Sequence, residues 1–171
     1  PLDEGIPFWI ASRFQSEKQF TLEDVQSLEQ LGALLDPFRP SANLFVAIRI
    51  TGTFNQVLVR SVSPVEEGAT LLDAAKAQTT FRHQAIQGTL VGFWSPSHAS
   101  SLNIPGYHLH FLSDDRQHGG HLLDLGADSL QVDFDLESNL RLALPETREF
   151  LMADLSGDPR SALEQAETKA G

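Results

Sequence analysis

Three histidines in the central part of the chain have a spacing suited to metal binding. His108 and His110 are two residues apart in a segment that alternates between polar and apolar side chains. Side chains of a strand point alternately to opposite faces, so both imidazoles are expected on one face. His121 follows eleven residues after His110, across a polar turn that ends in two glycines. If this turn closes a hairpin, His121 returns beside the other two, and three neutral imidazoles with an open fourth position are typical of catalytic zinc.

Other polar residues near this cluster offer alternative ligands. Asp114, Asp115 and Asp124 could bind the metal or accept a hydrogen bond that orients an imidazole. Asp114 and Asp115 also suit an ordinary turn, and this interpretation is the one we favour. His118 competes as a ligand, but its place in the middle of the turn favours a side chain in solvent.

Arg60 is the second feature that could do chemistry. It interrupts the apolar segment 53–62, so its side chain lies either on a solvated face or in a site. Facing a metal, its planar guanidinium would bind the carboxylate of an anionic substrate. A protein with a formal net charge of −11 needs such a local positive centre to attract an anion. The spacing leaves both interpretations open.

Composition limits the classes of partner. The 171 residues suit one domain or two small lobes, and the absence of cysteine excludes disulfides and thiolate metal sites. The net charge of −11 argues against nucleic acid or an anionic membrane as a partner. No apolar run approaches the roughly 20 residues of a membrane span, and no signal peptide is visible. We expect a cytoplasmic protein, although the chain begins at Pro1 and secretion stays open.

The elements that must position these residues are mostly strands. A helix is expected to begin at Thr21, to present an apolar stripe from Val25 to Leu35, and to end at Pro37. Hairpin turns are expected at 51–53 and at Gly88. This order predicts an α+β fold of mostly antiparallel or mixed sheets with a few peripheral helices. The predicted strands are 44–50, 53–62, 80–86, 88–95, 107–113, 120–125, 129–135 and 139–144, and the other predicted helices are 70–77 and 159–169.

The histidine-rich segment also resembles a known signature. Residues 106–116 together with the Gly-Gly-His of 119–121 closely resemble the motif of the α-acetolactate decarboxylases. The segments 51–54 with Arg60, 88–96 and 104–106 resemble the same family, in the family's order. The likeness extends from about Pro7 to the C-terminus.

The resemblance implies a function for the metal. Family members convert 2-hydroxy-2-methyl-3-oxobutanoate (2-acetolactate), a small anionic 2-hydroxy-3-keto acid, to acetoin and carbon dioxide. They use a zinc ion held by three histidines, which match His108, His110 and His121, and an active-site arginine, which matches Arg60. A glutamate of the C-terminal tail folds back towards the metal, and Glu167 is its best match, with Glu164 second. The family fold has two β-rich lobes and forms homodimers.

One part of the family pattern has no counterpart here. Family members carry an N-terminal portion with strands and another active-site glutamate, and Glu4 lies too close to Pro7 to match that residue. We therefore expect residues 1–171 to form a single acetolactate-decarboxylase-like domain that lacks this portion. Either the chain is a piece of a longer protein or it is a short relative, and missing strands would leave a sheet edge that favours association.

The chemistry fits these residue types. Decarboxylation of a β-keto acid puts negative charge on the carbonyl oxygen, which zinc stabilises as a Lewis acid. A cation such as Arg60 holds the carboxylate, and a nearby carboxylic acid can protonate the carbon.

Two other functions remain open from the residues alone. His-x-His on a strand also begins the cupin metal motif of dioxygenases and isomerases, which expects a glutamate where Asp114 and Asp115 stand. A short relative could instead bind a small carboxylate or another subunit without catalysis.

Overall fold

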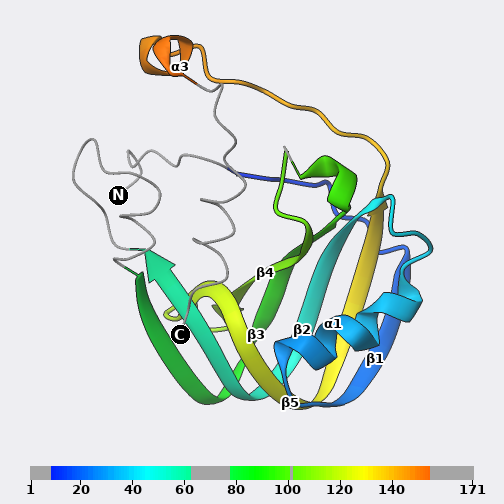
Figure 1. The fold of residues 1–171 in the computed structure, drawn as a ribbon. Helices are drawn as coiled ribbons and strands as arrows, with labels where there is room; N and C mark the ends of the chain where they lie inside the picture. Colours follow the sequence, from blue (N-terminus) through cyan, green and yellow to red (C-terminus); the bar gives the residue numbers. More distant parts are fainter. Residues whose placement is uncertain (1–8, 63–77, 101, 155–171) are drawn as a thin grey trace.

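The strands form one antiparallel sheet that helix α1 covers on one face (Figure 1). This computed structural model describes residues 9–62, 78–100 and 102–154. Its strand order is β1-β5-β2-β3-β4, which confirms the predicted α+β class with a mostly antiparallel sheet. All described strands belong to this one sheet. The two β-rich lobes expected from the family resemblance are therefore not seen as separate sheets in the described residues. The strands are β1 (Lys18–Val25), β2 (Phe45–Val62), β3 (Gln78–Ser95), β4 (Gly106–Ser113) and β5 (Gly119–Glu137).

The sheet closes on itself at one end of β5. There β5 pairs with β2 along one edge and with β4 along the other. Strands β2, β3, β4 and β5 thus make a closed ring, while β1 pairs with the far part of β5. The closure brings residues from three strands to one place.

The predicted start of the first helix, at Thr21, was wrong. Residues Lys18–Val25 pair with β5, and α1 (Leu28–Leu35) begins after Ser27, whose hydroxyl accepts a hydrogen bond from the Gln30 backbone N–H. Leu22 and Val25 are both buried although they are three residues apart, which imitates helical spacing. The strand achieves this with an irregularity at Asp24, whose φ is 55°. A short 3₁₀ helix, η1 (Asp36–Phe38), ends α1 near Pro37 as expected.

The two predicted hairpin turns are absent, because β2 and β3 are each continuous over 18 residues. Gly52 and Gly88 are direct partners within this strand pair. A Cβ on Gly52 would lie 2.8 Å from the Leu130 side chain, and one on Gly88 would lie 2.6 Å from the Leu112 carbonyl oxygen. The glycines therefore allow close approach of neighbouring strands in a strongly bent sheet (Figure 1).

The remaining boundaries are partly confirmed. Strand 107–113 corresponds to β4, whereas 120–125 and 129–135 are one strand, β5. The strand predicted over 139–144 is wrong, because these residues have no regular structure. Two short helices, η2 (Ser97–Ala99) and α3 (Arg148–Met152), were not predicted. The predicted helices 70–77 and 159–169 lie outside the described residues.

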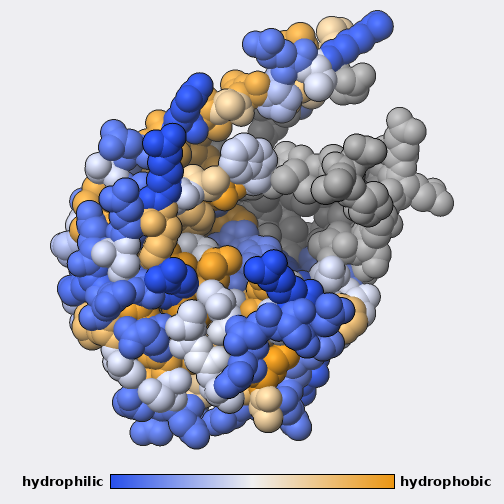
Figure 2. Space-filling view, turned by 180° about the vertical axis from the view of Figure 1, so that it is seen from behind, coloured by the Kyte–Doolittle hydropathy of each residue, from blue (hydrophilic) through white to orange (hydrophobic). Residues whose placement is uncertain are grey.

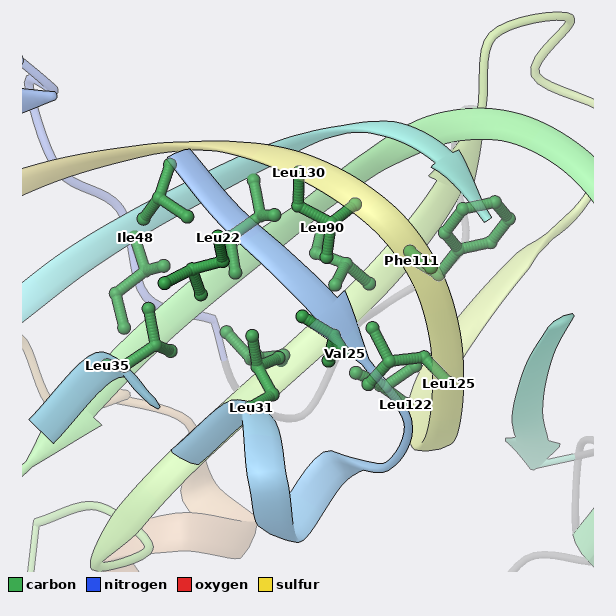
Figure 3. Close-up of a cluster of buried hydrophobic side chains, with 14 of the residues drawn as sticks. Leu22, Val25, Leu31, Leu35, Ile48, Leu90, Phe111, Leu122, Leu125 and Leu130 are labelled. Carbon is green, nitrogen blue, oxygen red and sulfur yellow. The ribbon is translucent and has the colours of Figure 1, made fainter. Parts of the chain in front are cut away.

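The hydrophobic core lies between the sheet and α1 (Figure 3). Leu31 and Leu35 of α1 are fully buried and belong to one cluster with Ile48 of β2 and Leu90 of β3. Phe111 of β4 joins the same cluster, as does Leu109. The core thus fixes which face of β4 is apolar, and the alternate residues must point to the other face.

Candidate metal centre

The three predicted histidines lie together on the face of the sheet opposite the core. The Nε2 atoms of His108 and His110 are 3.2 Å apart. One ring nitrogen from each of His108, His110 and His121 lies within 4.8 Å of the others. The expectation from strand alternation and from the Gly-Gly turn is confirmed. In the described parts of the chain, no other group of three potential ligands is this close.

The closure of the sheet places His121 in the cluster. His110 and His121 are direct partners on β4 and β5, and Phe111 pairs with Gly120. Gly120 has a φ of 152°, and a Cβ there would lie 2.5 Å from the Arg60 carbonyl oxygen. The glycine before His121 is therefore required for β5 to pass this close to β2.

Two of the neighbouring carboxylates, those of Asp115 and Asp124, have structural roles. Asp115 accepts hydrogen bonds from the Ser113 hydroxyl at 2.6 Å and from the Gln117 backbone N–H at 2.9 Å, as expected of a turn residue. Asp124 accepts from the Leu28 backbone N–H at the beginning of α1. His118 is exposed and lies against His83, outside the cluster, with ring centroids 4.6 Å apart.

Arg60 lies beside the histidines and not on a solvated face. It is the direct partner of His121 on β2, and only 4% of its surface is exposed. Its Nη1 donates a hydrogen bond to Oε1 of Gln78 at 3.1 Å. The structure thus brings together four of the five predicted site residues. Glu167 and its alternative Glu164 lie outside the described residues.

Burial and the charge of Arg60 keep two imidazoles neutral. Desolvation, followed by the positive charge of Arg60, lowers the pKa of His108. The same two causes, together with the other two histidines, lower the pKa of His121 to about 3. Neutral imidazole is the form that binds a metal ion, so His108 and His121 are held in the protonation state that a metal ligand requires.

A cavity of about 540 Å³ adjoins two of the metal-binding residues. His108 and His110 line it together with Arg49, Phe93 and the N-terminal segment that includes Phe14. Figure 2 shows this side of the molecule, opposite α1, as hollowed, with hydrophobic side chains beside hydrophilic ones. A larger and more open hollow, of about 780 Å³, lies against α1 and contains none of the three histidines. The smaller cavity is the better candidate for a substrate site because it contains metal-binding residues.

Comparison with known proteins identifies the family. Residues 1–157 match the alpha-acetolactate decarboxylase family. The alpha-acetolactate decarboxylase of Brevibacillus brevis is 34% identical over 170 residues, which are 99% of this chain and 60% of that protein. The chain belongs to this family.

Further relatives agree with the family assignment. The alpha-acetolactate decarboxylase of Methanosarcina mazei is 37% identical over 94% of this chain and 56% of its own length. The crystal structure of alpha-acetolactate decarboxylase from Bacillus subtilis strain 168 has a TM-score of 0.85 at 32% identity, over 90% of this chain and 67% of that one. The chain thus spans 56–60% of the first two proteins' length. Membership in this family does not support the cupin-like alternatives, which were a dioxygenase and an isomerase.

The sequence analysis missed a row of acidic residues on β5 that binds the N-terminal segment lining the cavity. Asp133 accepts a hydrogen bond from the Ser16 hydroxyl at 2.8 Å, and Asp135 accepts from the Gln15 backbone N–H at 2.7 Å. Glu137 accepts from the Ser12 hydroxyl. The available signal was the alternation of acidic and apolar residues over 132–137, which places the carboxylates on one face of a strand.

Asp133 is also tied to the cavity through Arg49. The Arg49 guanidinium donates two hydrogen bonds to Oδ2 of Asp133, at 3.1 and 3.2 Å, and lies 5.1 Å from the Phe14 ring centroid. Burial would raise the pKa of Asp133, but hydrogen bonds from Ser16, Gln19 and Arg49 outweigh it and lower the pKa. Asp133 is therefore an ionised anchor for the segment that includes Phe14.

Proposed function

We propose that this chain contains the catalytic metal centre of an acetolactate decarboxylase that converts 2-acetolactate to acetoin and carbon dioxide. The observation that supports it most directly is the cluster of His108, His110 and His121 beside the buried cation Arg60. Three imidazoles without a thiolate or carboxylate suit a zinc ion. When bound, zinc supplies Lewis acidity towards the keto and hydroxyl oxygens of the substrate.

Arg60 binds and orients the substrate carboxylate in this proposal. A planar guanidinium matches a carboxylate through paired hydrogen bonds, and burial makes such charge-assisted bonds stronger than in water. The carboxylate is the group that leaves as carbon dioxide, so Arg60 fixes the bond that breaks relative to the metal centre. The cavity beside His108 and His110 gives the substrate access.

Glu167, with Glu164 as the alternative, supplies the second chemical function. After carbon dioxide leaves, the carbon needs a proton, and a carboxylic acid held close to it can donate one. The family resemblance supports a role for a glutamate of the C-terminal tail.

The domain organisation, the oligomeric state and the location of the protein belong to the same proposal. Residues 1–171 form one acetolactate-decarboxylase-like domain of this enzyme, and two copies form a homodimer in the cytoplasm, with secretion as the alternative. Exposed apolar residues support association, because Leu140, Leu142 and Leu144 are each more than half exposed. Within the described residues, no helix is long and apolar enough to cross a membrane.

A metal-dependent assay tests the proposed function. The purified protein should contain about one zinc ion per chain, release carbon dioxide and acetoin from 2-acetolactate, lose this activity with a chelator, and regain it with zinc. Replacement of both His108 and His110 by Ala should abolish turnover, and unchanged turnover would reject the mechanism. Binding of a 2-hydroxy acid without carbon dioxide release would indicate a non-catalytic relative. Iron or manganese with oxygen uptake would indicate a cupin-like enzyme.

A further inference from the structure

We propose that Gln78 is a positioning residue, which holds the Arg60 guanidinium at the metal centre so that it can bind the substrate carboxylate. This inference rests on the proposed function. It concerns how Arg60 is kept in place, because an arginine side chain has several rotatable bonds and must be ordered to act as a rigid receptor.

The register of β2 and β3 places the two residues on one face. Arg60 is the direct partner of Thr80, and Val62 is the direct partner of Gln78. Residues two apart on a strand share a face, so Gln78 is the diagonal neighbour of Arg60. The hydrogen bond of 3.1 Å from Nη1 of Arg60 to Oε1 of Gln78 follows from this placement. On the other side of β2, Arg60 has His121 as its partner.

The chemistry of the acceptor matters as much as its position. Arg60 is 4% exposed, and a buried guanidinium donor needs an acceptor. An amide oxygen satisfies the donor and adds no negative charge, whereas a carboxylate at the same place would form an ion pair and reduce the attraction for an anionic substrate. A neutral acceptor therefore suits a cation that must bind the substrate carboxylate.

Two substitutions separate position from charge. Gln78→Leu removes this acceptor at similar volume and leaves the guanidinium less constrained. Gln78→Glu keeps the shape and the acceptor but adds a negative charge beside Arg60. Both should raise KM for 2-acetolactate by about tenfold with a smaller change in kcat, because carboxylate binding precedes the loss of carbon dioxide. The zinc content should stay at the wild-type value.

A second readout does not depend on activity. Phenylglyoxal modifies accessible guanidinium groups, and mass mapping of the peptide that contains Arg60 measures its rate. Gln78→Leu should raise the modification rate of Arg60 several-fold, whereas Gln78→Glu should lower it. A general loss of packing would raise the rate in both variants, so opposite changes identify positioning. Gln84→Leu and Gln84→Glu are matched controls, since Gln84 is exposed on the same strand and pairs with Gln56.

The outcomes are distinguishable from failure of the proposed function. Unchanged KM and unchanged Arg60 modification in both Gln78 variants would overturn the inference, as would equal effects in the Gln84 controls. If the wild-type zinc protein releases no carbon dioxide, the proposed function fails. The modification rates of Arg60 then still decide whether Gln78 holds the guanidinium. If Gln78→Leu does not fold, Gln78→Glu decides the question, because a raised KM with slower modification supports positioning and an unchanged KM refutes it.

Discussion

His110 and His121 face each other as direct partners on β4 and β5, and Arg60 of β2 is the partner on the other side of His121. This row across three strands joins two potential metal ligands to a buried cation. The backbone of the metal centre is therefore held by strand pairing and not by a loop.

Removal of one imidazole should weaken zinc binding strongly. His121→Gln should lower the zinc affinity by at least about 100-fold, because substitution of a group that merely supports a ligand already costs 10–100-fold. Competition with a chromophoric chelator measures this. His98→Gln is the matched control, since His98 is exposed in η2, and it should bind zinc as the wild type does. Equal affinities of the wild type and His121→Gln would contradict the assignment of His121 as a ligand.

Substitution of Gly120 should disturb both stability and metal binding. Gly120→Ala adds a Cβ 2.5 Å from the Arg60 carbonyl oxygen at a φ of 152°. We expect a loss of about 2–4 kcal/mol in the free energy of unfolding, from strain and from the displaced strand. Zinc affinity should also fall, because His121 is the next residue. Urea unfolding and chelator competition measure the two effects.

Gly106→Ala separates strain from the close contact. Gly106 has a φ of 91°, but no atom lies within 4 Å of a Cβ built there. This variant should lose only the conformational cost of about 1–3 kcal/mol and keep its zinc affinity. If Gly120→Ala behaves no differently, the contact with the Arg60 carbonyl has no effect on the site.

The metal-free protein should lose stability as the pH falls below about 6.5. The pKa of His121 is lowered from its ordinary value of 6.5 to about 3 in the folded chain. Between these values the unfolded chain binds a proton that the folded chain excludes, so acid favours unfolding. One such group contributes up to about 1.4 kcal/mol per pH unit, and the contribution vanishes above pH 6.5. Urea unfolding at pH 7 and pH 5 measures it, and metal-free His121→Gln should show a smaller difference. Equal differences in the two proteins would count against the lowered pKa.

Loss of the Asp133 charge should loosen the segment that lines the cavity. Asp133→Asn weakens the hydrogen bonds from Ser16, Gln19 and Arg49. Charge-assisted hydrogen bonds contribute about 1.5–3 kcal/mol each, so hydrogen exchange over residues 9–17 should accelerate. Asp128→Asn is a suitable control, because Asp128 is exposed and accepts a hydrogen bond from Asn55. Unchanged exchange in Asp133→Asn would show that the anchor is not needed.

The metal centre was largely predictable because its signal is local. Two histidines at period two must share a face of a strand, and the Gly-Gly turn brings back the third. The position of Arg60 beside His121 depends on the pairing of β2 with β5, whose paired residues are 61 to 92 residues apart in sequence, and spacing along one strand cannot decide it. The acidic row was missed for the same reason, since its partners lie 84 to 125 residues away.

The strand boundaries were less predictable because glycine has two uses. Gly52 and Gly88 suggest turns, but in the sheet they allow neighbouring strands to approach closely. Leu22 and Val25 suggest a helix, but the irregularity at Asp24 turns both inward from a strand. In each case tertiary packing decides between two local structures with the same sequence pattern.

The pairing of β5 with a strand on each side at His121 affects how the protein acquires its metal ion. Hydrogen-bonded strands on both sides hold the backbone of this residue whether or not an ion is bound, so the receptor is preorganised. A zinc finger, by contrast, unfolds without its metal. Here stripping and reloading should be fully reversible without a refolding step, and a cell could synthesise the folded apoprotein first and supply the metal later.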